Sequence, residues 1–341
     1  MKIAFFDTHS YDREAFEACS LASQHQLTFF HEKLNGNTSG LAKGTEAVCC
    51  FVNDRLDRKT LTDLKAQGVK LVLLRCAGFN QVDLVAASEL ALPVARVPEY
   101  SPHAVAEHAV ALLMNLNRKI HRSYNRVREG NFSIEHLVGF DVFGKTVGVL
   151  GTGRIGRVFC EILLGFGARV VAFDLKKDLE LEKKGITYDS FEKVLKVSDI
   201  VSLHLPLNEK TRHLIDDRAL GLCKKGVVLL NTSRGALVDT KALIKGLKSG
   251  HVGAAGLDVY EEEEFFFFND LSDSVIQDDL LARLMTFPNV ILTSHQAFLT
   301  KEALANIAWT TLNNASTFEL KKPLQNEVHV ESHSPRGIPE K

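Results

Sequence analysis

Short apolar runs, almost uninterrupted by polar residues, recur along this chain and limit the folds that it can adopt. Five of them lie in the first hundred residues, at 3–6, 27–30, 48–52, 71–74 and 94–97. Six more follow, at 146–150, 169–173, 200–203, 227–230, 254–257 and 290–292. Such runs are typical of strands buried on both faces, as in a parallel sheet covered by helices. Because longer polar segments separate the runs, the sequence predicts an α/β fold.

A longer helical pattern lies between the two groups of runs. Ser101 can cap this helix, and Pro102 suits its first position. Apolar residues then recur at helical spacing, at Val105, Ala109, Leu112, Leu113 and Leu116. With 341 residues, the chain is long enough for two domains. No stretch rich in glycine or serine divides it, so we expect this helix to connect the two domains.

Two segments do not follow the alternation of strands and helices. Residues 261–279 are acidic yet contain four consecutive phenylalanines, so we expect part of this insertion to pack against the body of the protein. From about Glu327 onward the chain is polar and contains proline and glycine. We expect this C-terminal tail to be frayed.

The composition argues against several classes of function. The formal net charge is −1, so nothing in the total charge favours binding to nucleic acid or to a membrane surface. No apolar run approaches the roughly 18 residues of a membrane span, and the run near the N-terminus is too short for a signal peptide. The six cysteines form no CxxC pair and no zinc-binding pattern. We therefore expect reduced thiols, no metal site, and a cytoplasmic protein that acts on small molecules.

A glycine motif follows the strand expected at 146–150. Residues 151–156 read Gly-Thr-Gly-Arg-Ile-Gly and lead into a helix-like stretch, which is the order that a dinucleotide-binding motif requires. In this motif Gly151 permits a tight turn, Gly153 lets backbone approach a pyrophosphate, and Gly156 lets helix and strand pack closely. The N-terminus of the helix then offers unpaired N–H groups to the phosphates. The motif alone is a weak signal, and a glycine turn without a ligand is the alternative.

Asp174 strengthens the dinucleotide interpretation. It ends the strand expected at 169–173 and lies 18 residues beyond Gly156, close to the usual spacing for a carboxylate that binds the adenosine ribose. A carboxylate there would repel the 2′-phosphate of NADP, so the sequence favours NAD. Lys176 and Lys177 weaken this preference.

Polar residues follow nearly every expected strand of the second group. The set comprises Asp174, His204, Asn231, Thr232, Ser233, Arg234, Asp258, Thr293, Ser294 and His295. The carboxyl ends of parallel strands face one crevice, and ligands bind there in open α/β sheets. We therefore expect distant parts of the chain to meet at a single site.

These residue types fit the reduction of a 2-keto acid. Hydride transfer leaves negative charge on the carbonyl oxygen, and a histidine is well matched to donate a proton near neutral pH. An arginine can bind the substrate carboxylate through two parallel hydrogen bonds, and a carboxylate beside the imidazole favours its protonated form. His295, Arg234 and one of the glutamates at 261–264 meet these needs. Each of these residues is also compatible with an ordinary surface position. We expect His204 to pack near the cofactor and to take no part in the reaction.

Together, these motifs resemble those of the D-isomer-specific 2-hydroxy-acid dehydrogenases, from residue 1 to about residue 328. The resemblance rests on residues 151–156, on Asn-Thr-Ser-Arg-Gly at 231–235, on Asp-Val-Tyr-Glu-Glu-Glu at 258–263, and on the Ser-His pair at 294–295. It implies that Arg234, Glu263 and His295 are catalytic. Within the family, the segments 74–80, 97–102 and 295–300 are most similar to the fermentative D-lactate dehydrogenases of bacteria. Ser294 stands where the family often has proline.

The same resemblance implies the binding residues. The NAD site would comprise Gly151, Gly153, Arg154, Ile155, Gly156, Asp174, Leu205, Pro206, Thr211, Thr232, Ser233 and Asp258. The backbone of Ala77 and Gly78 would hold the substrate carboxylate, and Tyr100 would line the substrate pocket together with Arg234 and His295.

The family fold would be two doubly wound parallel-sheet domains. A Rossmann nucleotide domain at 101–298 would be inserted in a flavodoxin-like substrate domain made of residues 1–100 and 299–341. The implied function is reduction of pyruvate to D-lactate with NADH, carried out by a homodimer or homotetramer, with His295 as proton donor. The alternatives are another D-2-hydroxy acid, such as a branched or aromatic one or 3-phosphoglycerate, and a non-catalytic NAD-sensing scaffold similar to a transcriptional co-repressor.

Overall fold

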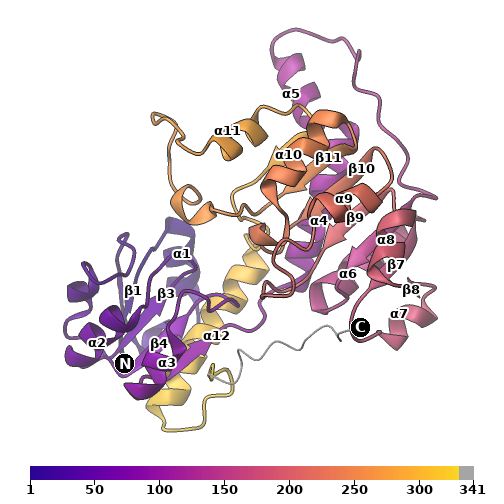
Figure 1. Cartoon of the computed structure of the whole chain (residues 1–341). Coiled ribbons are helices and arrows are strands. Elements are labelled where there is room, and N and C mark those ends of the chain that lie inside the picture. The colour runs from indigo at the N-terminus through magenta and orange to yellow at the C-terminus, as the bar shows by residue number, and fades with distance from the viewer. Residues whose placement is uncertain (330–341) are drawn as a thin grey trace. The chain divides into compact units, whose positions relative to one another are not determined.

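The computed structural model describes residues 1–329, and these divide into two compact units (Figure 1). Unit 1 consists of residues 1–101 and 298–329, and unit 2 of residues 102–297. These bounds differ by one residue from the expected domain bounds. Each unit is built on one sheet in which all strands are parallel.

Unit 1 contains a five-stranded sheet in the order β2-β1-β3-β4-β5. The strands are β1 (Lys2–Phe5), β2 (Gln26–Phe29), β3 (Ala47–Cys50), β4 (Leu71–Leu74) and β5 (Val94–Arg96). The helices are α1 (Ser10–Ala18), η1 (Ala22–Gln24), η2 (Ser39–Ala42), α2 (Arg58–Ala66), α3 (Leu84–Glu89) and α12 (Lys301–Glu319). Because α12 packs against α1, β4 and β5, the unit is completed by a distant part of the sequence.

Unit 2 contains a seven-stranded sheet in the order β12-β11-β10-β9-β6-β7-β8. The strands are β6 (Thr146–Leu150), β7 (Arg169–Phe173), β8 (Thr187–Tyr188), β9 (Ile200–Leu203), β10 (Val227–Asn231), β11 (Val252–Leu257) and β12 (Val290–Leu292). The helices are α4 (Pro102–Arg118), α5 (Ile120–Arg128), α6 (Arg154–Gly165), α7 (Leu179–Lys183), α8 (Phe191–Val197), α9 (Asp217–Leu222), η3 (Gly235–Leu237), α10 (Thr240–Ser249), η4 (Glu263–Phe265) and α11 (Asp279–Met285). The direction of winding reverses between β6 and β9, which is the position where such sheets bind ligands.

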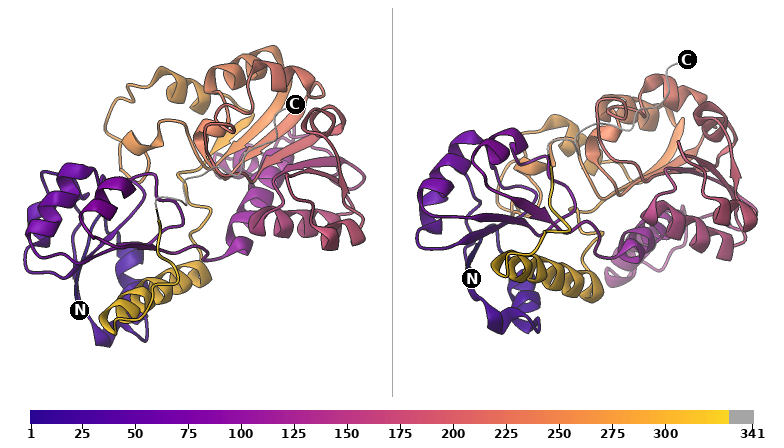
Figure 2. Two further views of the ribbon diagram at one scale, coloured as in Figure 1. Left: turned by 60° about the horizontal axis from the view of Figure 1, so that its bottom comes forward. Right: turned by 90° about the horizontal axis from the view of Figure 1, so that it is seen from below.

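Two hydrophobic cores cover the two faces of the sheet in unit 2. Figure 2 shows the ribbon of the chain from two further sides. One core contains residues of α4 and α6, and the other contains residues of α8, α9, α10 and α11. Neighbouring strand residues alternate between them: Val149 belongs to the first core and Leu150 to the second. Because successive side chains of a strand point to opposite faces, every strand between the cores must be apolar throughout.

The parallel α/β architecture expected from the sequence is therefore confirmed. Every apolar run singled out above forms a strand, with bounds within two residues of those expected. Strand β8 was not expected, because it is a two-residue edge strand without an apolar run. The acidic insertion packs as expected, since Phe267 is buried in a core of unit 2 and Phe266 and Phe268 lie against the same core.

The expectation that the chain frays from Glu327 onward was wrong for the first residues of that segment. The N–H of Val328 donates to the carbonyl of Val94 at 2.8 Å, and Glu327 forms an antiparallel bridge with Ala95. Val328 is buried, so a single apolar side chain extends the sheet past the last helix. The rest of the expected tail, residues 330–341, lies outside the described residues.

The helix expected to connect the domains is α4, and it belongs wholly to unit 2. It packs against β10, β11 and α6. A Cβ atom at Gly256 of β11 would lie 3.1 Å from side-chain atoms of Leu112 and Leu116, so helix and strand are in close contact. Within residues 1–329, no helix is long and apolar enough to cross a membrane.

The turn between β6 and α6 generates a testable prediction about stability. A Cβ atom at Gly156 would lie 2.0 Å from the carbonyl oxygen of Gly151, so Gly156→Ala must displace backbone. We expect this substitution to lower the free energy of unfolding by about 1–3 kcal/mol in urea denaturation. Gly153→Ala is the control, because no atom lies within 4 Å of its Cβ position. Equal stability of the two variants would contradict the close contact.

Candidate active site

The glycine turn after β6 has the geometry that its sequence predicts. Gly151 has a φ of +94°, and a Cβ atom there would lie 2.4 Å from the carbonyl oxygen of His204. The turn therefore touches the end of the neighbouring strand β9, and only glycine fits. Gly156 packs against Gly151 from the first turn of α6. This close contact is the one that the third glycine of a dinucleotide-binding turn provides.

The open side of this turn can accept a phosphate group. Gly153 caps α6, and a Cβ atom built on it would meet nothing within 4 Å. Arg154 and Ile155 form the first turn of α6 next to it, with Arg154 exposed to solvent. A helix N-terminus with an uncrowded glycine lets backbone N–H groups approach an anion. The residues present thus fit a dinucleotide pyrophosphate.

Asp174 lies beside the same turn. It follows β7, and its Oδ2 accepts hydrogen bonds from the N–H and the hydroxyl of Thr152, at 2.6 and 3.2 Å. Its Oδ1 accepts from the N–H of Lys176 at 3.1 Å. The carboxylate is half-buried, so it is held at the edge of the turn while still reaching solvent. That is a suitable place for an acceptor of ribose hydroxyls.

The loop after β9 is closed by Thr211. The Thr211 hydroxyl donates to the carbonyl of Pro206 at 2.7 Å and accepts from the N–H of Asn208 at 2.9 Å. This side chain is therefore used inside the loop, where it shapes the segment that contains Leu205 and Pro206. Leu205 in turn packs against a core of unit 2.

His204 is suited to a structural role. Its Nε2 lies 2.9 Å from the hydroxyl of Ser202, and its ring packs against Phe159. Burial lowers the pKa of His204 to about 3, so the ring is neutral at physiological pH. A neutral ring of this kind cannot serve as the source of a proton near pH 7, in line with the expected role.

Arg234 follows β10 in a turn that its neighbours hold. Ser233 donates its hydroxyl to the carbonyl of Leu203 at 2.7 Å, and the Asn231 amide donates to the carbonyl of Arg234 at 2.9 Å. The Arg234 guanidinium donates to the carbonyl of Ser233 at 2.6 Å and makes no ion pair with any residue between 1 and 329. Thr232 is buried, and its hydroxyl has no partner among the described residues. A half-buried guanidinium of this kind can receive an anionic substrate.

His295 and Glu263 form a close pair. Nδ1 of His295 lies 2.7 Å from Oε1 of Glu263, and both side chains are more than four-fifths buried. Because an ionised carboxylate only accepts hydrogen bonds, Nδ1 carries the proton and Nε2 remains for another partner. The second oxygen of Glu263 accepts from the N–H of Tyr260 at 3.0 Å. Among the four consecutive glutamates, Glu263 is the one whose carboxylate contacts His295.

Asp258 supports the loop that contains His295. It is fully buried at the end of β11, and its carboxylate accepts from the hydroxyl of Thr293 at 2.5 Å and the N–H groups of Gln296 and Ala297 at 2.9 and 2.8 Å. Burial raises its pKa, but hydrogen bonds from His108 and Thr293 outweigh this and hold the pKa below the usual range. The sequence suggested only a contact with the cofactor for this side chain.

The remaining predicted residues belong to unit 1, after β4 and β5. The N–H groups of Ala77 and Gly78 donate no hydrogen bond within the described part of the chain, so both can bind a carboxylate. Arg96 donates to the carbonyl of Ala77 at 2.7 Å and holds this turn in place. Tyr100 packs edge-on against Phe298, with ring centroids 6.3 Å apart.

Several residues that hold the site were not predicted from the sequence. Glu261 accepts from Nε2 of His213 at 2.5 Å and from the hydroxyl of Thr240 at 3.1 Å, which anchors the segment that contains Glu263. His108 of α4 contacts Thr293 and Asp258. These residues lie in ordinary helix and loop positions, and no spacing rule relates them to the strand ends.

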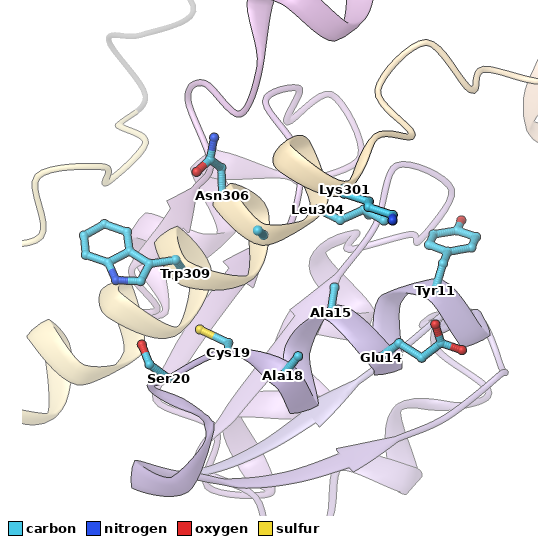
Figure 3. A pocket seen from close by; sticks show the side chains of 11 residues that line it. Tyr11, Glu14, Ala15, Ala18, Cys19, Ser20, Lys301, Leu304, Asn306 and Trp309 are labelled. Carbon is cyan, nitrogen blue, oxygen red and sulfur yellow. The ribbon is translucent and has the colours of Figure 1, made fainter.

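One groove in unit 1 is not formed by the predicted site residues. A groove of about 600 Å³ lies in unit 1 between α1 and α12, with Tyr11 and Lys301 at one end and Trp309 at the other (Figure 3). It contains none of the residues predicted to bind cofactor or substrate. Among residues 1–329, no group of three histidine, cysteine or acidic side chains could hold a metal ion. The predicted site residues lie instead at the strand ends of each sheet.

Comparisons with known proteins agree with this geometry. Residues 110–297 match the family model of the D-isomer specific 2-hydroxyacid dehydrogenase NAD binding domain. The chain is 52% identical to 2-hydroxyacid dehydrogenase A of Aspergillus oryzae over 98% of its length and 96% of that protein. The apo-structure of D-lactate dehydrogenase from Escherichia coli is similar with a TM-score of 0.89 and 46% identity, covering 96% of this chain and all of that one.

A second similar structure contains the cofactor. The NAD-complexed D-isomer specific 2-hydroxyacid dehydrogenase from Lactobacillus delbrueckii ssp. bulgaricus has a TM-score of 0.80 and 32% identity, with 96% of this chain and 100% of that chain covered. The cofactor of the family is NAD, and the glycine turn described here has the shape to bind it. The chain therefore belongs to the D-isomer-specific 2-hydroxyacid dehydrogenases, a family of NAD-dependent oxidoreductases.

Proposed function

We propose that this protein is an NAD-dependent D-lactate dehydrogenase that reduces pyruvate to D-lactate. The observation that carries the proposal is the His295–Glu263 pair, with 2.7 Å between Nδ1 and Oε1. His295 follows β12, Glu263 follows β11, and Arg234 follows the adjacent strand β10. Bound NADH would supply the hydride. The side chains of the chain itself must supply substrate binding and the proton.

Arg234 binds the keto acid in this mechanism. Its guanidinium is half-buried and makes no ion pair with another described residue, so a carboxylate can bind through two parallel hydrogen bonds. Within unit 1, the N–H groups of Ala77 and Gly78 are suited to hold a carboxylate, and the rings of Tyr100 and Phe298 pack against each other. The positive charge of Arg234 also stabilises the oxygen on which negative charge develops.

His295 donates the proton to that oxygen. Glu263 accepts the Nδ1–H group and therefore fixes the tautomer and orientation of the ring, which directs Nε2 to the substrate. The carboxylate also stabilises the imidazolium, the form that can give up a proton. The ring and the carboxylate are both largely buried, which strengthens this interaction.

The choice of pyruvate rests on relatives. The name D-lactate dehydrogenase belongs to the Escherichia coli protein, whose whole length is matched by 96% of this chain. We extend that activity to this chain because it contains every side chain that the mechanism needs. A panel of 2-keto acids with straight, branched and aromatic side chains, assayed by NADH oxidation, tests the substrate. A higher kcat/KM for a branched or aromatic acid than for pyruvate would replace lactate in the proposal.

We propose further that the protein is a homodimer or a tetramer of dimers and acts in the cytoplasm. Support comes from a surface that we call the arm, residues 120–143, which comprises α5 and the segment after it. Figure 1 shows α5, the first part of the arm, at the top of unit 2. The arm returns to a core of that unit at Phe140 and Val142. Its exposed large apolar side chains are Ile120, Tyr124, Val127, Phe132, Ile134, Val138 and Phe143. Such a patch is typical of an interface.

Five of the six cysteines are buried free thiols, which suits the proposed cytoplasmic location, a reducing compartment.

The proton donor is tested by His295→Gln. Removing a general acid typically costs about 10²–10⁴ in rate, so kcat should fall by that range while NADH still binds. Turnover is measured by NADH absorbance and binding by the fluorescence of NADH. His251→Gln is a matched control, because His251 precedes β11 at the opposite edge of the sheet. Near-normal turnover of the His295 variant would remove this histidine from the mechanism.

Cofactor selectivity is tested by Asp174→Asn. Asparagine can still accept the N–H of Thr152 but has no charge, so the glycine turn keeps its support while repulsion of a 2′-phosphate is lost. We expect the ratio of kcat/KM for NADH over NADPH to fall about tenfold, equivalent to about 1.4 kcal/mol. An unchanged ratio would show that another group selects the cofactor.

The arm is tested by the double variant Phe132→Asp, Ile134→Asp. Both side chains are more than three-quarters exposed, so the single chain should fold normally while association is lost. Light scattering after gel filtration should give the mass of a dimer or larger for the unmodified protein and of one chain for the variant. Val275→Asp, which changes an equally exposed apolar residue elsewhere, is the control. A variant that keeps the larger mass would place the interface on another surface.

A further inference from the structure

A buried network lies directly behind the loop that contains His295. Asp258 binds the loop at four places: its carboxylate accepts from Thr293, Gln296 and Ala297, and its backbone carbonyl accepts from the N–H of His295 at 2.7 Å. One buried residue thus determines the path of the chain on both sides of the proposed proton donor.

The loop needs this support because His295 is in an unfavourable conformation. Its φ is +48°, in the left-handed region that residues with a Cβ atom rarely adopt. Such a conformation persists only where surrounding contacts determine it. With this backbone, the ring lies within 2.7 Å of Glu263. Any change that releases the loop should therefore also release the ring from Glu263.

His108 completes the network from another element. Its Nε2 lies 3.1 Å from the hydroxyl oxygen of Thr293 and 3.4 Å from Oδ1 of Asp258. The Thr293 hydroxyl has one proton, which it donates to the ionised Asp258, so it can only accept from His108. The His108 ring must then carry a proton on Nε2. His108 therefore donates to Thr293, and Thr293 donates to Asp258.

Helix α4 holds His108 in a fixed position. The next residue, Ala109, and Leu112 one turn further on are buried in a core of unit 2. Gly256 of β11, two residues before Asp258, has no room for a Cβ atom because Leu112 and Leu116 lie against it. The helix and the strand end are therefore packed directly on each other, and the side chain of His108 is mostly buried between them.

We propose that His108 is a positioning residue for proton transfer. Through Thr293 and Asp258, its Nε2–H group holds the loop in the conformation that pairs His295 with Glu263. The inference rests on the proposed function, because it gives His108 a role only if His295 donates the proton. It assigns His108 no contact with the substrate. A histidine that merely fills space beside α4 would have no effect on the ring of His295.

Two substitutions at His108 separate these possibilities. His108→Phe keeps a ring of similar volume but has no donor, whereas His108→Gln keeps an N–H group at comparable reach. Misplacement of a reacting group by about 1 Å can cost about 100-fold in rate, so we expect His108→Phe to lower kcat by about 10- to 100-fold. NADH affinity should stay within about threefold, and His108→Gln should restore kcat to within about threefold of the unmodified protein.

The second readout does not depend on turnover. In protein labelled with ¹⁵N at histidine, long-range ¹H–¹⁵N spectra report the tautomer of each ring. His108 should be protonated at Nε2, and the resonances of His295 should move or broaden in His108→Phe but not in His108→Gln. The matched control is His251→Phe, which removes a histidine bonded to the carbonyl of Leu220 at 2.8 Å, away from the strand ends. It should change neither kcat nor the His295 resonances.

Thr293→Val provides an independent test if the phenylalanine variant is unstable. Valine keeps the shape of threonine but removes the hydroxyl between His108 and Asp258 and leaves only their direct approach of 3.4 Å. Its effect on kcat should therefore be in the same direction as that of His108→Phe. The double variant should lose little more than either single variant, because both interrupt one chain of hydrogen bonds.

The outcomes also distinguish this inference from the proposed function. Normal turnover in His295→Gln would overturn the proposed function. Loss of turnover in His295→Gln together with a kcat within about twofold of normal in His108→Phe would overturn only the role of His108. The same conclusion would follow if His108→Gln failed to rescue turnover, if the His295 resonances were unchanged in His108→Phe, or if the effects of His108→Phe and Thr293→Val simply multiplied.

Discussion

Three neighbouring parallel strands determine where chemistry can occur in this chain. β10, β11 and β12 lie side by side in the order of the sheet, and different functional residues follow each of them. Arg234 follows β10, Asp258 and Glu263 follow β11, and His295 follows β12. Parallel strands bring all their carboxyl ends to one edge, so residues far apart in the sequence become neighbours. An antiparallel pairing of any one strand would move its end to the opposite edge.

The buried hydrogen bonds of Asp258, behind the carboxyl edge of the sheet, are as specific as the contacts at that edge. Asp258 is fully buried, and its charge is compatible with burial because side-chain and backbone donors surround it. These donors belong to the loop of His295, so the same hydrogen bonds that satisfy the carboxylate also impose the positive φ of the histidine. The burial of Asp258 and the conformation of His295 therefore depend on one set of contacts in this part of unit 2.

The fold was predictable because the same apolar strand pattern repeats along the chain. Each strand that is buried on both faces must be apolar along its length, and eleven such runs predicted a parallel α/β fold. The glycine turn was predictable for a related reason: φ angles and close contacts at Gly151 and Gly156 exclude every larger residue. The parts of the fold that were not predicted were a short strand and a single isolated apolar residue. β8 has two residues, and Val328 extends the sheet through one apolar side chain in a polar segment.

The candidate site was only partly predictable. Local pattern placed Arg234 and His295 at strand ends, and resemblance to the family chose Glu263. Position along the sequence could not show that Glu261, two residues earlier, pairs with His213 instead. Nor could it show that Thr211 is used inside its own loop, or that α4 belongs to unit 2.

The amino-acid sequence by itself determined the strand pattern, the glycine turn and the residue types available for reaction, because backbone sterics and burial act on each short segment separately. Only the tertiary structure decided which of those side chains meet. His108 reaches Asp258 because α4 packs on β11, and this depends on how two apolar surfaces fit in three dimensions. Hydrogen-bond partners are chosen at distances of about 3 Å, and no spacing along the chain specifies a distance of that kind between separate elements.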